Sequence, residues 1–98
     1  MRLATIATAE ATTAAVLLDG TWHALPFPDL SALFAAGPVN AGRLRAHACR
    51  GIEGARLVLP LPSPSKVICC GLNYGDHIAE TGRAAPRYPT LFAKYADT

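Results

Sequence analysis

The sequence of 98 residues lacks an apolar run long enough to cross a membrane, and it contains few aromatic side chains. Its amino terminus, MRLATIATAE, has no long apolar segment, which argues against a secretory signal peptide. Aromatic residues make up only 7% of the chain and alanine is abundant, so each buried residue contributes little to stability. Because 51% of the residues are apolar, we nevertheless expect a folded protein.

Cysteine is scarce as well. The chain has Cys49, Cys69 and Cys70, and an odd number with two adjacent residues argues against a disulfide framework. No Cys-x-x-Cys pair or Cys/His spacing typical of a zinc site occurs. These features indicate a reducing compartment, and we expect a cytoplasmic protein.

Charge of either sign is limited, since nine Lys and Arg against seven Asp and Glu give a net charge of +2. The only local basic cluster, Arg43, Arg45 and Arg50, has a spacing that suits the exposed face of a helix. A nucleic-acid surface needs a denser basic patch with interleaved aromatic residues. The pattern therefore predicts neither a nucleic acid nor a membrane as a partner.

The first part of the chain is rich in residues that favour β-strands. Residues 2–25 contain three β-rich runs, and the second run ends in Asp19-Gly20. Glycine accepts a positive φ without strain, so this dipeptide predicts a tight hairpin turn. We expect a three-stranded antiparallel meander that ends at Pro26.

Two short helices are predicted to follow. Asp29 can cap the first one, and Gly37 ends it. Asn40 can cap the second one, which is expected over residues 41–50 and closed by Gly51. The residues of the second helix expected to face inward are Ala41, Leu44 and Ala48.

Prolines mark a boundary between two parts of the chain. The run ARLVLPLP predicts a strand that passes into an extended linker, because Pro60, Pro62 and Pro64 do not permit a helix. The predicted parts are an amino-terminal domain at residues 1–59, a linker at residues 60–65 and a second unit at residues 66–98.

The second unit is expected to alternate strand, helix and strand. KVICC predicts a buried strand, residues 73–82 a short helix, and TLFAKY another strand, with a loop at residues 84–89 between them. The fold class predicted for the whole chain is therefore α+β.

Polar side chains gather directly after the strand VICC. Asn73 and Asp76 are explained as caps of the following helix. His77 and Glu80 are three residues apart, so on a helix they share one face and can interact. A carboxylate beside an imidazole fixes its tautomer, and such a pair can take a proton from water or from a carbon acid. On spacing alone, an exposed helix pair with no catalytic role is the more common explanation.

The spacing P-L-P-x-P-x-K-V-I-C-x-G-L-N-Y-x-D-H-x-x-E, followed by Y-P-T-L-F-A-K, resembles the fumarylacetoacetate hydrolase family. It covers residues 60–95 almost continuously, and MRLATI with the later VLLDG is similar to the small leader domain of many bacterial members. The resemblance implies an α+β leader domain followed by the first strands of an incomplete mixed β-sandwich catalytic domain.

The resemblance also implies a chemistry. Members act on 2-oxo acids or acylpyruvates by C–C bond hydrolysis, decarboxylation, isomerisation or hydration, often as cytoplasmic homodimers in the catabolism of aromatic compounds. They use Mg²⁺ or Mn²⁺ held by a Glu-x-Glu pair and a later Asp. His77, supported by Glu80, is implied to activate water or to move a proton. The residues implied to line the substrate pocket are Asn73, Tyr74, Phe92 and Lys94.

One element of the family pattern is missing. No Glu-x-Glu occurs in the 98 residues, and in relatives the metal-binding carboxylates follow the motif. We therefore expect the amino-terminal part of a metal-dependent enzyme, without metal ligands and inactive on its own. The second hypothesis is a non-catalytic interaction or scaffolding module, because residues 1–59 contain no convergent set of polar residues.

Overall fold

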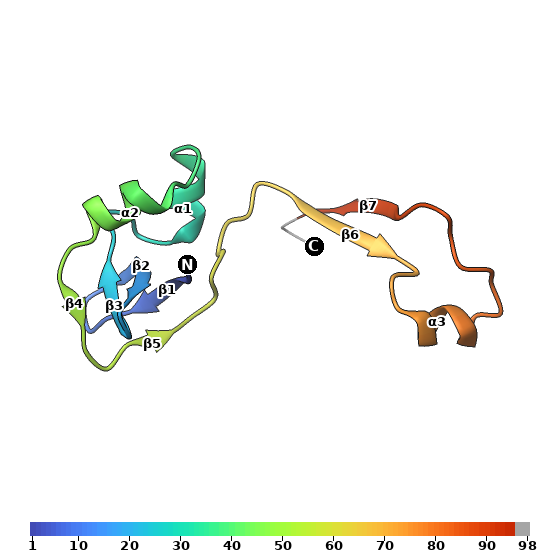
Figure 1. Cartoon of the computed structure of the whole chain (residues 1–98), viewed down its shortest axis with the longest axis horizontal. Helices are drawn as coiled ribbons and strands as arrows, with labels where there is room; N and C mark the ends of the chain where they lie inside the picture. The colour runs from blue at the N-terminus through green and yellow to red at the C-terminus, as the bar shows by residue number, and fades with distance from the viewer. Residues whose placement is uncertain (96–98) are drawn as a thin grey trace. The chain divides into compact units, whose positions relative to one another are not determined.

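The computed structural model describes residues 1–95, which form an α+β arrangement of short helices and antiparallel strands (Figure 1). The chain divides into two compact units, and the division falls between Ser63 and Pro64. This point lies within the proline-rich stretch. The helices in the described part of the chain are too short and too polar to cross a membrane.

A three-stranded meander opens the first unit. Strands β1 (Leu3–Ala7), β2 (Thr12–Leu18) and β3 (Thr21–Ala24) pair antiparallel in chain order. Asp19 and Gly20 form the turn between β2 and β3 with φ of 48° and 82°. Two successive positive φ values match the right-handed twist of the flanking strands. The predicted meander and its turn are confirmed.

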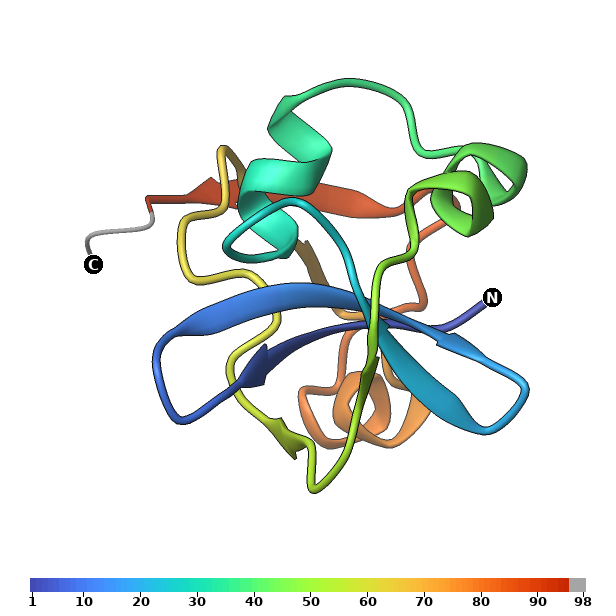
Figure 2. The same cartoon turned by 90° about the vertical axis from the view of Figure 1, so that its left-hand side faces the viewer.

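Two very short strands extend the meander on both sides. Strand β4 (Gly51–Ile52) pairs with β3, and β5 (Arg56–Leu57) pairs with β1. The result is a curled antiparallel sheet of five strands in the order β4-β3-β2-β1-β5 (Figure 2). The strand predicted from ARLVLPLP is thus confirmed, but only two of its residues enter the ladder.

Helices α1 (Leu30–Ala35) and α2 (Ala41–His47) begin where the sequence predicts. The Asp29 side chain accepts a hydrogen bond at 2.8 Å from the amide three residues later, and Asn40 accepts the equivalent bond at 3.2 Å. Both predicted caps are therefore present, and each satisfies an amide that the helix leaves unpaired.

The second helix is shorter than predicted because the chain turns toward the sheet. Helix α2 ends at His47 rather than at residue 50. The Cys49 amide donates to the Ala24 carbonyl at 2.8 Å, and the Ala24 amide donates to the Arg50 carbonyl at 3.1 Å. Gly51 consequently begins β4 and does not close the helix. Pairing with the end of β3 replaces the last helical turn.

Both helices cover one face of the sheet (Figure 2). Leu44 of α2 is buried as predicted, and Ala48 is half-buried against the same core. Ala41 is exposed, contrary to the prediction, because the first residue of this short helix lies beyond the covered face. The buried residues of this core are Ala14, Val16, Leu25, Leu30, Leu33 and Leu44.

The opposite face of the sheet carries a smaller core. Ala4, Ile6 and Ala15 are buried there, next to the partly buried Trp22 and Ile52. Neighbouring residues of β2 thus belong to different cores, as expected for side chains that alternate across a strand. Small alanine side chains in the central strands let both faces pack closely.

Thr5 is the buried polar residue of the first unit, with 1% of its surface exposed. Its hydroxyl donates to the Pro60 carbonyl at 2.7 Å and accepts from the Leu30 amide at 3.1 Å. One side chain thereby joins β1, the start of α1 and the proline-rich stretch. Because the hydroxyl both donates and accepts a hydrogen bond, its burial does not carry a large desolvation penalty.

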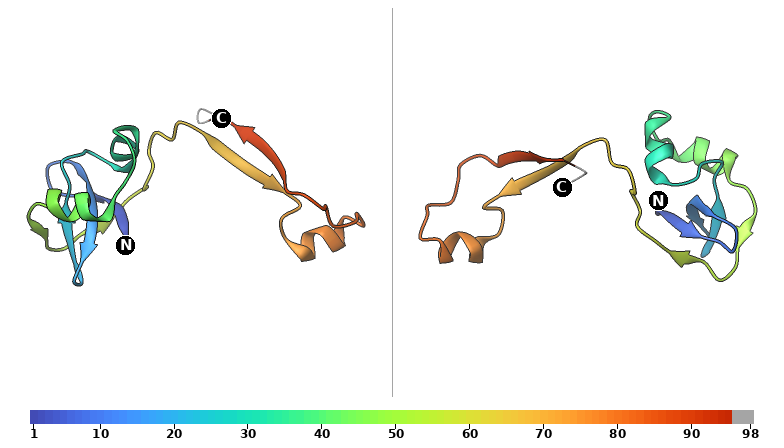
Figure 3. Two further views of the ribbon diagram at one scale, coloured as in Figure 1. Left: turned by 45° about the horizontal axis from the view of Figure 1, so that its top comes forward. Right: turned by 180° about the vertical axis from the view of Figure 1, so that it is seen from behind.

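The second unit is a β-hairpin with a helix in its connection (Figure 3). Strand β6 (Val67–Gly71) pairs antiparallel with β7 (Thr90–Lys94), and α3 (Gly75–Glu80) lies between them in sequence. The predicted strand, helix and strand are all present. The helix is two residues shorter at each end than the predicted residues 73–82.

The prediction that KVICC is a buried strand is wrong. Side chains of β6 alternate between half-buried and exposed, and Ile68 is 63% exposed. No residue between positions 64 and 95 is buried. Two strands and one short helix provide no second layer that could cover a face of the hairpin.

Candidate functional site

The chain leaves β6 one residue later than the sequence predicts, because the strand was expected to end at Cys70 and Gly71 to make the turn. Gly71 remains in the strand, and Leu72 takes the positive φ of 51°. Helix α3 then begins at Gly75 with Tyr74 as the N-cap residue and no side-chain cap hydrogen bond. Asn73 lies one position before the cap, so its predicted role with Asp76 as a capping pair is wrong.

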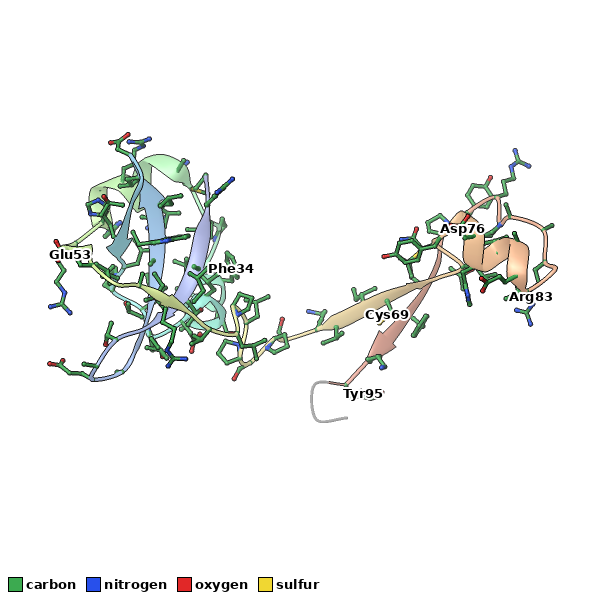
Figure 4. All side chains as sticks on the ribbon, turned by 90° about the horizontal axis from the view of Figure 1, so that it is seen from below. Phe34, Glu53, Cys69, Asp76, Arg83 and Tyr95 are labelled. Carbon is green, nitrogen blue, oxygen red and sulfur yellow. The ribbon has the colours of Figure 1, made fainter. Side chains whose placement is uncertain are left out.

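His77 and Glu80 lie on α3, as their spacing predicts, and both side chains are exposed. Figure 4 shows this helix, marked by Asp76, at one end of the hairpin that carries Cys69. Within residues 1–95, no hydrogen bond or ion pair joins His77 to Glu80. The structure thus places the two groups on one water-accessible helix without linking them.

A shallow pocket of about 250 Å³ lies next to α3. The end of β6 and the start of the connection form one wall, and the loop after α3 forms the other. Asn73 lines this pocket together with the half-buried Ile78 of the helix. The polar residues of the far wall are Arg87 and Tyr88. Of the residues predicted to contact substrate, Asn73 is therefore the one that the structure brings into a concave site.

The two predicted aromatic pocket residues lie outside this lining. Tyr74 is 75% exposed. Phe92 is 49% exposed, and its ring lies over Gly71, where an added Cβ atom would meet it at 3.7 Å. Phe92 is thus beside the pocket, whereas Tyr74 projects into solvent.

Lys94 lies at the far end of the hairpin from α3. It pairs with Val67, whereas Gly71 and Thr90 form the pair nearest the helix. Lys94 follows Thr90 by four residue steps along the strand, which corresponds to about 13 Å. The register therefore does not bring Lys94 to the pocket or to His77.

Arg87 and Tyr88 line the pocket although no pattern in the sequence indicated them. The Arg87 guanidinium carbon lies 5.6 Å from the centre of the Tyr88 ring, within the range of a cation–π contact. The sequence predicted only a loop at this point. One feature of the sequence could have indicated them, because the Arg-Tyr pair lies between Pro86 and Pro89, and these prolines restrict the backbone on both sides.

The described residues do not fit a divalent metal site. Between Met1 and Tyr95, no group of three His, Cys, Asp or Glu side chains is placed to share one ion. Mg²⁺ and Mn²⁺ require several oxygen ligands around one point. Asp76 and Glu80 are the acidic residues of α3, and they do not form such a set.

The remaining histidines belong to the first unit and have structural partners. His23 Nδ1 lies 3.1 Å from the Cys49 carbonyl oxygen, and His47 Nδ1 lies 2.7 Å from the Arg43 carbonyl oxygen. A carbonyl only accepts, so both Nδ1 atoms carry the hydrogen. Backbone contacts within the first unit thus hold both rings.

No family model matches the chain. Segments of it align with the mitochondrial oxaloacetate tautomerase fahd2 of Xenopus laevis, at 40% identity over 42 residues. The fumarylacetoacetate hydrolase domain-containing protein 2 homolog of Dictyostelium discoideum is 41% identical over 44 residues. Protein Rv2993c of Mycobacterium tuberculosis is 51% identical over 43 residues.

These matches cover 43%, 45% and 44% of this chain but only 13%, 14% and 16% of the relatives. The similarity therefore concerns a short part of much longer proteins. At 40–51% identity over more than 40 residues, the chain is partly homologous to proteins with a fumarylacetoacetate hydrolase domain.

Proposed function

We propose that this chain supplies an acid–base pair to an enzyme that acts on 2-oxo acids or acylpyruvates. The observation that carries the proposal is the placement of His77 and Glu80 on α3, directly after β6, in a chain homologous to proteins with a fumarylacetoacetate hydrolase domain. Two exposed proton-transfer groups on one helix, beside a pocket, suit chemistry on a small polar substrate.

In this proposal His77 takes the proton, and Glu80 orients the imidazole. For isomerisation of a 2-oxo acid, the imidazole removes a proton from the carbon next to the carbonyl, and the resulting imidazolium returns that proton, directly or through water, to the carbonyl oxygen to give the enol. For hydrolysis or decarboxylation, the same groups activate water or protonate the enolate. Residues three apart on a helix can meet after a change of rotamer, which supports this role for Glu80.

The pocket supports a substrate of this size. Asn73 provides amide donors and an acceptor on one wall, and Phe92 provides an apolar surface beside Gly71. Tyr74 and Lys94 contribute to substrate binding only if further structure brings them closer. We also propose that β6 and β7 are the first strands of a mixed β-sandwich. The protein is further proposed to be a cytoplasmic homodimer.

A divalent metal is the cofactor that the resemblance implies, and the donor set of residues 1–95 does not fit it. The contribution proposed for this chain is limited to proton transfer by His77 and to the orientation of its ring by Glu80.

The test uses the full protein product of the gene with oxaloacetate and an acylpyruvate in the presence of Mg²⁺. His77→Ala is expected to lower kcat by about 10² to 10⁴-fold, the range typical of general acid–base catalysis. Glu80→Gln should lower it less, and Glu53→Gln, in an exposed loop of the first unit, should leave it unchanged. Unchanged turnover in His77→Ala would remove this histidine from the mechanism.

A second candidate function is that of a non-catalytic interaction module. It is supported by the exposed, unlinked His77 and Glu80 and by a first unit that has its own cores. The reading frame of the gene discriminates between the two. Continuation into a Glu-x-Glu sequence favours the enzyme, whereas a stop codon after Thr98 together with no turnover favours the module.

A further inference from the structure

A groove of about 200 Å³ lies in the first unit between the loop that joins the two helices and helix α2. Its floor consists of Leu25, Leu33 and Leu44, which are 3%, 6% and 5% exposed. The half-buried Phe27 and Val39 continue this apolar surface. The floor is thus part of the folded core and is held in place without a ligand.

The polar residues of the groove gather on one side of it. They are Asn40, Arg43 and His47, and all three are exposed on or next to α2. The contact of His47 Nδ1 with the Arg43 carbonyl at 2.7 Å fixes the ring against the helix. Since Nδ1 carries the hydrogen, Nε2 remains available toward solvent.

The charge around the groove has one sign. No acidic residue lines it, and the sequence contains no Asp or Glu from residue 30 to residue 52. Arg43, Arg45 and Arg50 lie in the same stretch, and in the described residues none of them forms an ion pair. An uncompensated cation beside a low-dielectric surface attracts anions more strongly than a paired one.

We propose that this groove binds a small amphipathic anion, namely an aryl or short alkyl carboxylate. The apolar part lies on Leu25, Leu33 and Leu44, and the carboxylate faces the guanidinium of Arg43. Arginine suits this role because its planar fork of N–H donors matches a carboxylate. The volume is below the usual range for drug-sized ligands and suits one ring with a short chain.

This site is independent of the function proposed for His77, because all its residues belong to the first unit. It does not depend on turnover, on a metal or on the helix α3. Its ligand chemistry follows from the apolar floor and from the unopposed charge of Arg43.

The experiment is a titration of the purified chain with 3-phenylpropionate, followed by amide chemical shifts. We expect saturable shifts that are confined to the lining of the groove, at residues 25–27, 33 and 36–47. The uncharged analogue 3-phenylpropanol should bind at least fivefold more weakly, because it keeps the ring and lacks the charge.

Two matched variants test whether Arg43 is the residue that binds the carboxylate. Arg43→Gln should weaken the binding of 3-phenylpropionate at least fivefold, whereas Arg45→Gln, on the same helix but outside the groove, should change it less than twofold. Both positions are exposed, so neither change removes core packing. Absence of saturable shifts, equal binding of the alcohol, or equal effects of both variants would overturn the proposal.

Discussion

Thr5 joins three parts of the chain that are far apart in sequence, and its hydroxyl is almost fully buried. Thr5→Val keeps the shape of the side chain but leaves the Leu30 amide and the Pro60 carbonyl without their partner. A buried group without a partner costs about 1–3 kcal/mol. We expect the free energy of unfolding in urea to fall by about that amount.

The control for this prediction keeps the hydroxyl. Thr5→Ser preserves both hydrogen bonds and loses only one methyl group, so it should cost clearly less than Thr5→Val. If the two variants lower the free energy of unfolding equally, packing of the methyl group explains the role of Thr5, and its hydrogen bonds do not.

Some features of the candidate site could be predicted from single residues of the sequence, and others could not. The spacing of His77 and Glu80 predicted their shared helix because helical geometry is local. Their contact depends on rotamers and on neighbours, and neither is encoded in the spacing. Arg87 and Tyr88 enter the pocket through the fold of a loop, so no local pattern marked them as lining residues. The catalytic roles themselves stay predictions.

At the scale of elements, the hairpin between β2 and β3 depends on a turn with two positive φ values. A Cβ atom added at Gly20 would meet nothing within 4 Å, so Gly20→Ala tests the backbone conformation alone. The left-handed conformation costs an ordinary residue about 1–2 kcal/mol. We expect the midpoint of urea unfolding to fall accordingly.

Gly20→Asn is the matched variant, because asparagine adopts the left-handed conformation more readily than alanine. It should recover part of the stability that Gly20→Ala loses. If alanine proves as stable as glycine at this position, the turn does not adopt the described conformation in solution.

Helices and strands were predicted correctly where their bounds depend on neighbouring residues, and incorrectly where they depend on residues far away in the sequence. The turn at Gly20 and the caps Asp29 and Asn40 depend on a few neighbouring residues, and the sequence predicted them. The end of α2 depends on pairing with β3, so the predicted residues 41–50 were too long. The burial of β6 depends on what covers it, which periodicity cannot show.

At the scale of the whole molecule, the buried residues of the described chain all belong to the first unit. Ile6 is 0% exposed, whereas Ile68 in the second unit is 63% exposed. Ile6→Ala should therefore cost about 2–5 kcal/mol in the free energy of unfolding. Ile68→Ala should stay within about 0.5 kcal/mol of the unchanged chain, as for other surface substitutions.

Equal effects of Ile6→Ala and Ile68→Ala on chemical unfolding, followed by circular dichroism, would contradict this expectation. They would mean that the hairpin of the second unit has a buried face in solution. The comparison thus tests whether cooperative unfolding belongs to residues 1–63 alone.

The second unit exposes apolar side chains on a hairpin whose outer strand edges have no partner strand in the described chain. Leu91 is 62% exposed and Phe92 is 49% exposed. Unpaired edges and uncovered apolar faces favour association between chains, and an isolated hairpin is at best marginally stable. We therefore expect this chain either to self-associate through β6 and β7 or to show little amide protection there.

Sedimentation over a concentration series, combined with hydrogen exchange mapped by residue, tests this expectation. If the chain associates, Leu91→Lys should reduce association, because it places a charge on the exposed strand β7. Phe34→Lys is the matched control, since Phe34 is 44% exposed but lies on α1 of the first unit (Figure 4). If the chain remains monomeric, amides of β1 and β2 should be protected and those of Thr90–Lys94 should exchange rapidly. A monomer with strong protection across Thr90–Lys94 would show that the hairpin is stable by itself and would refute the prediction.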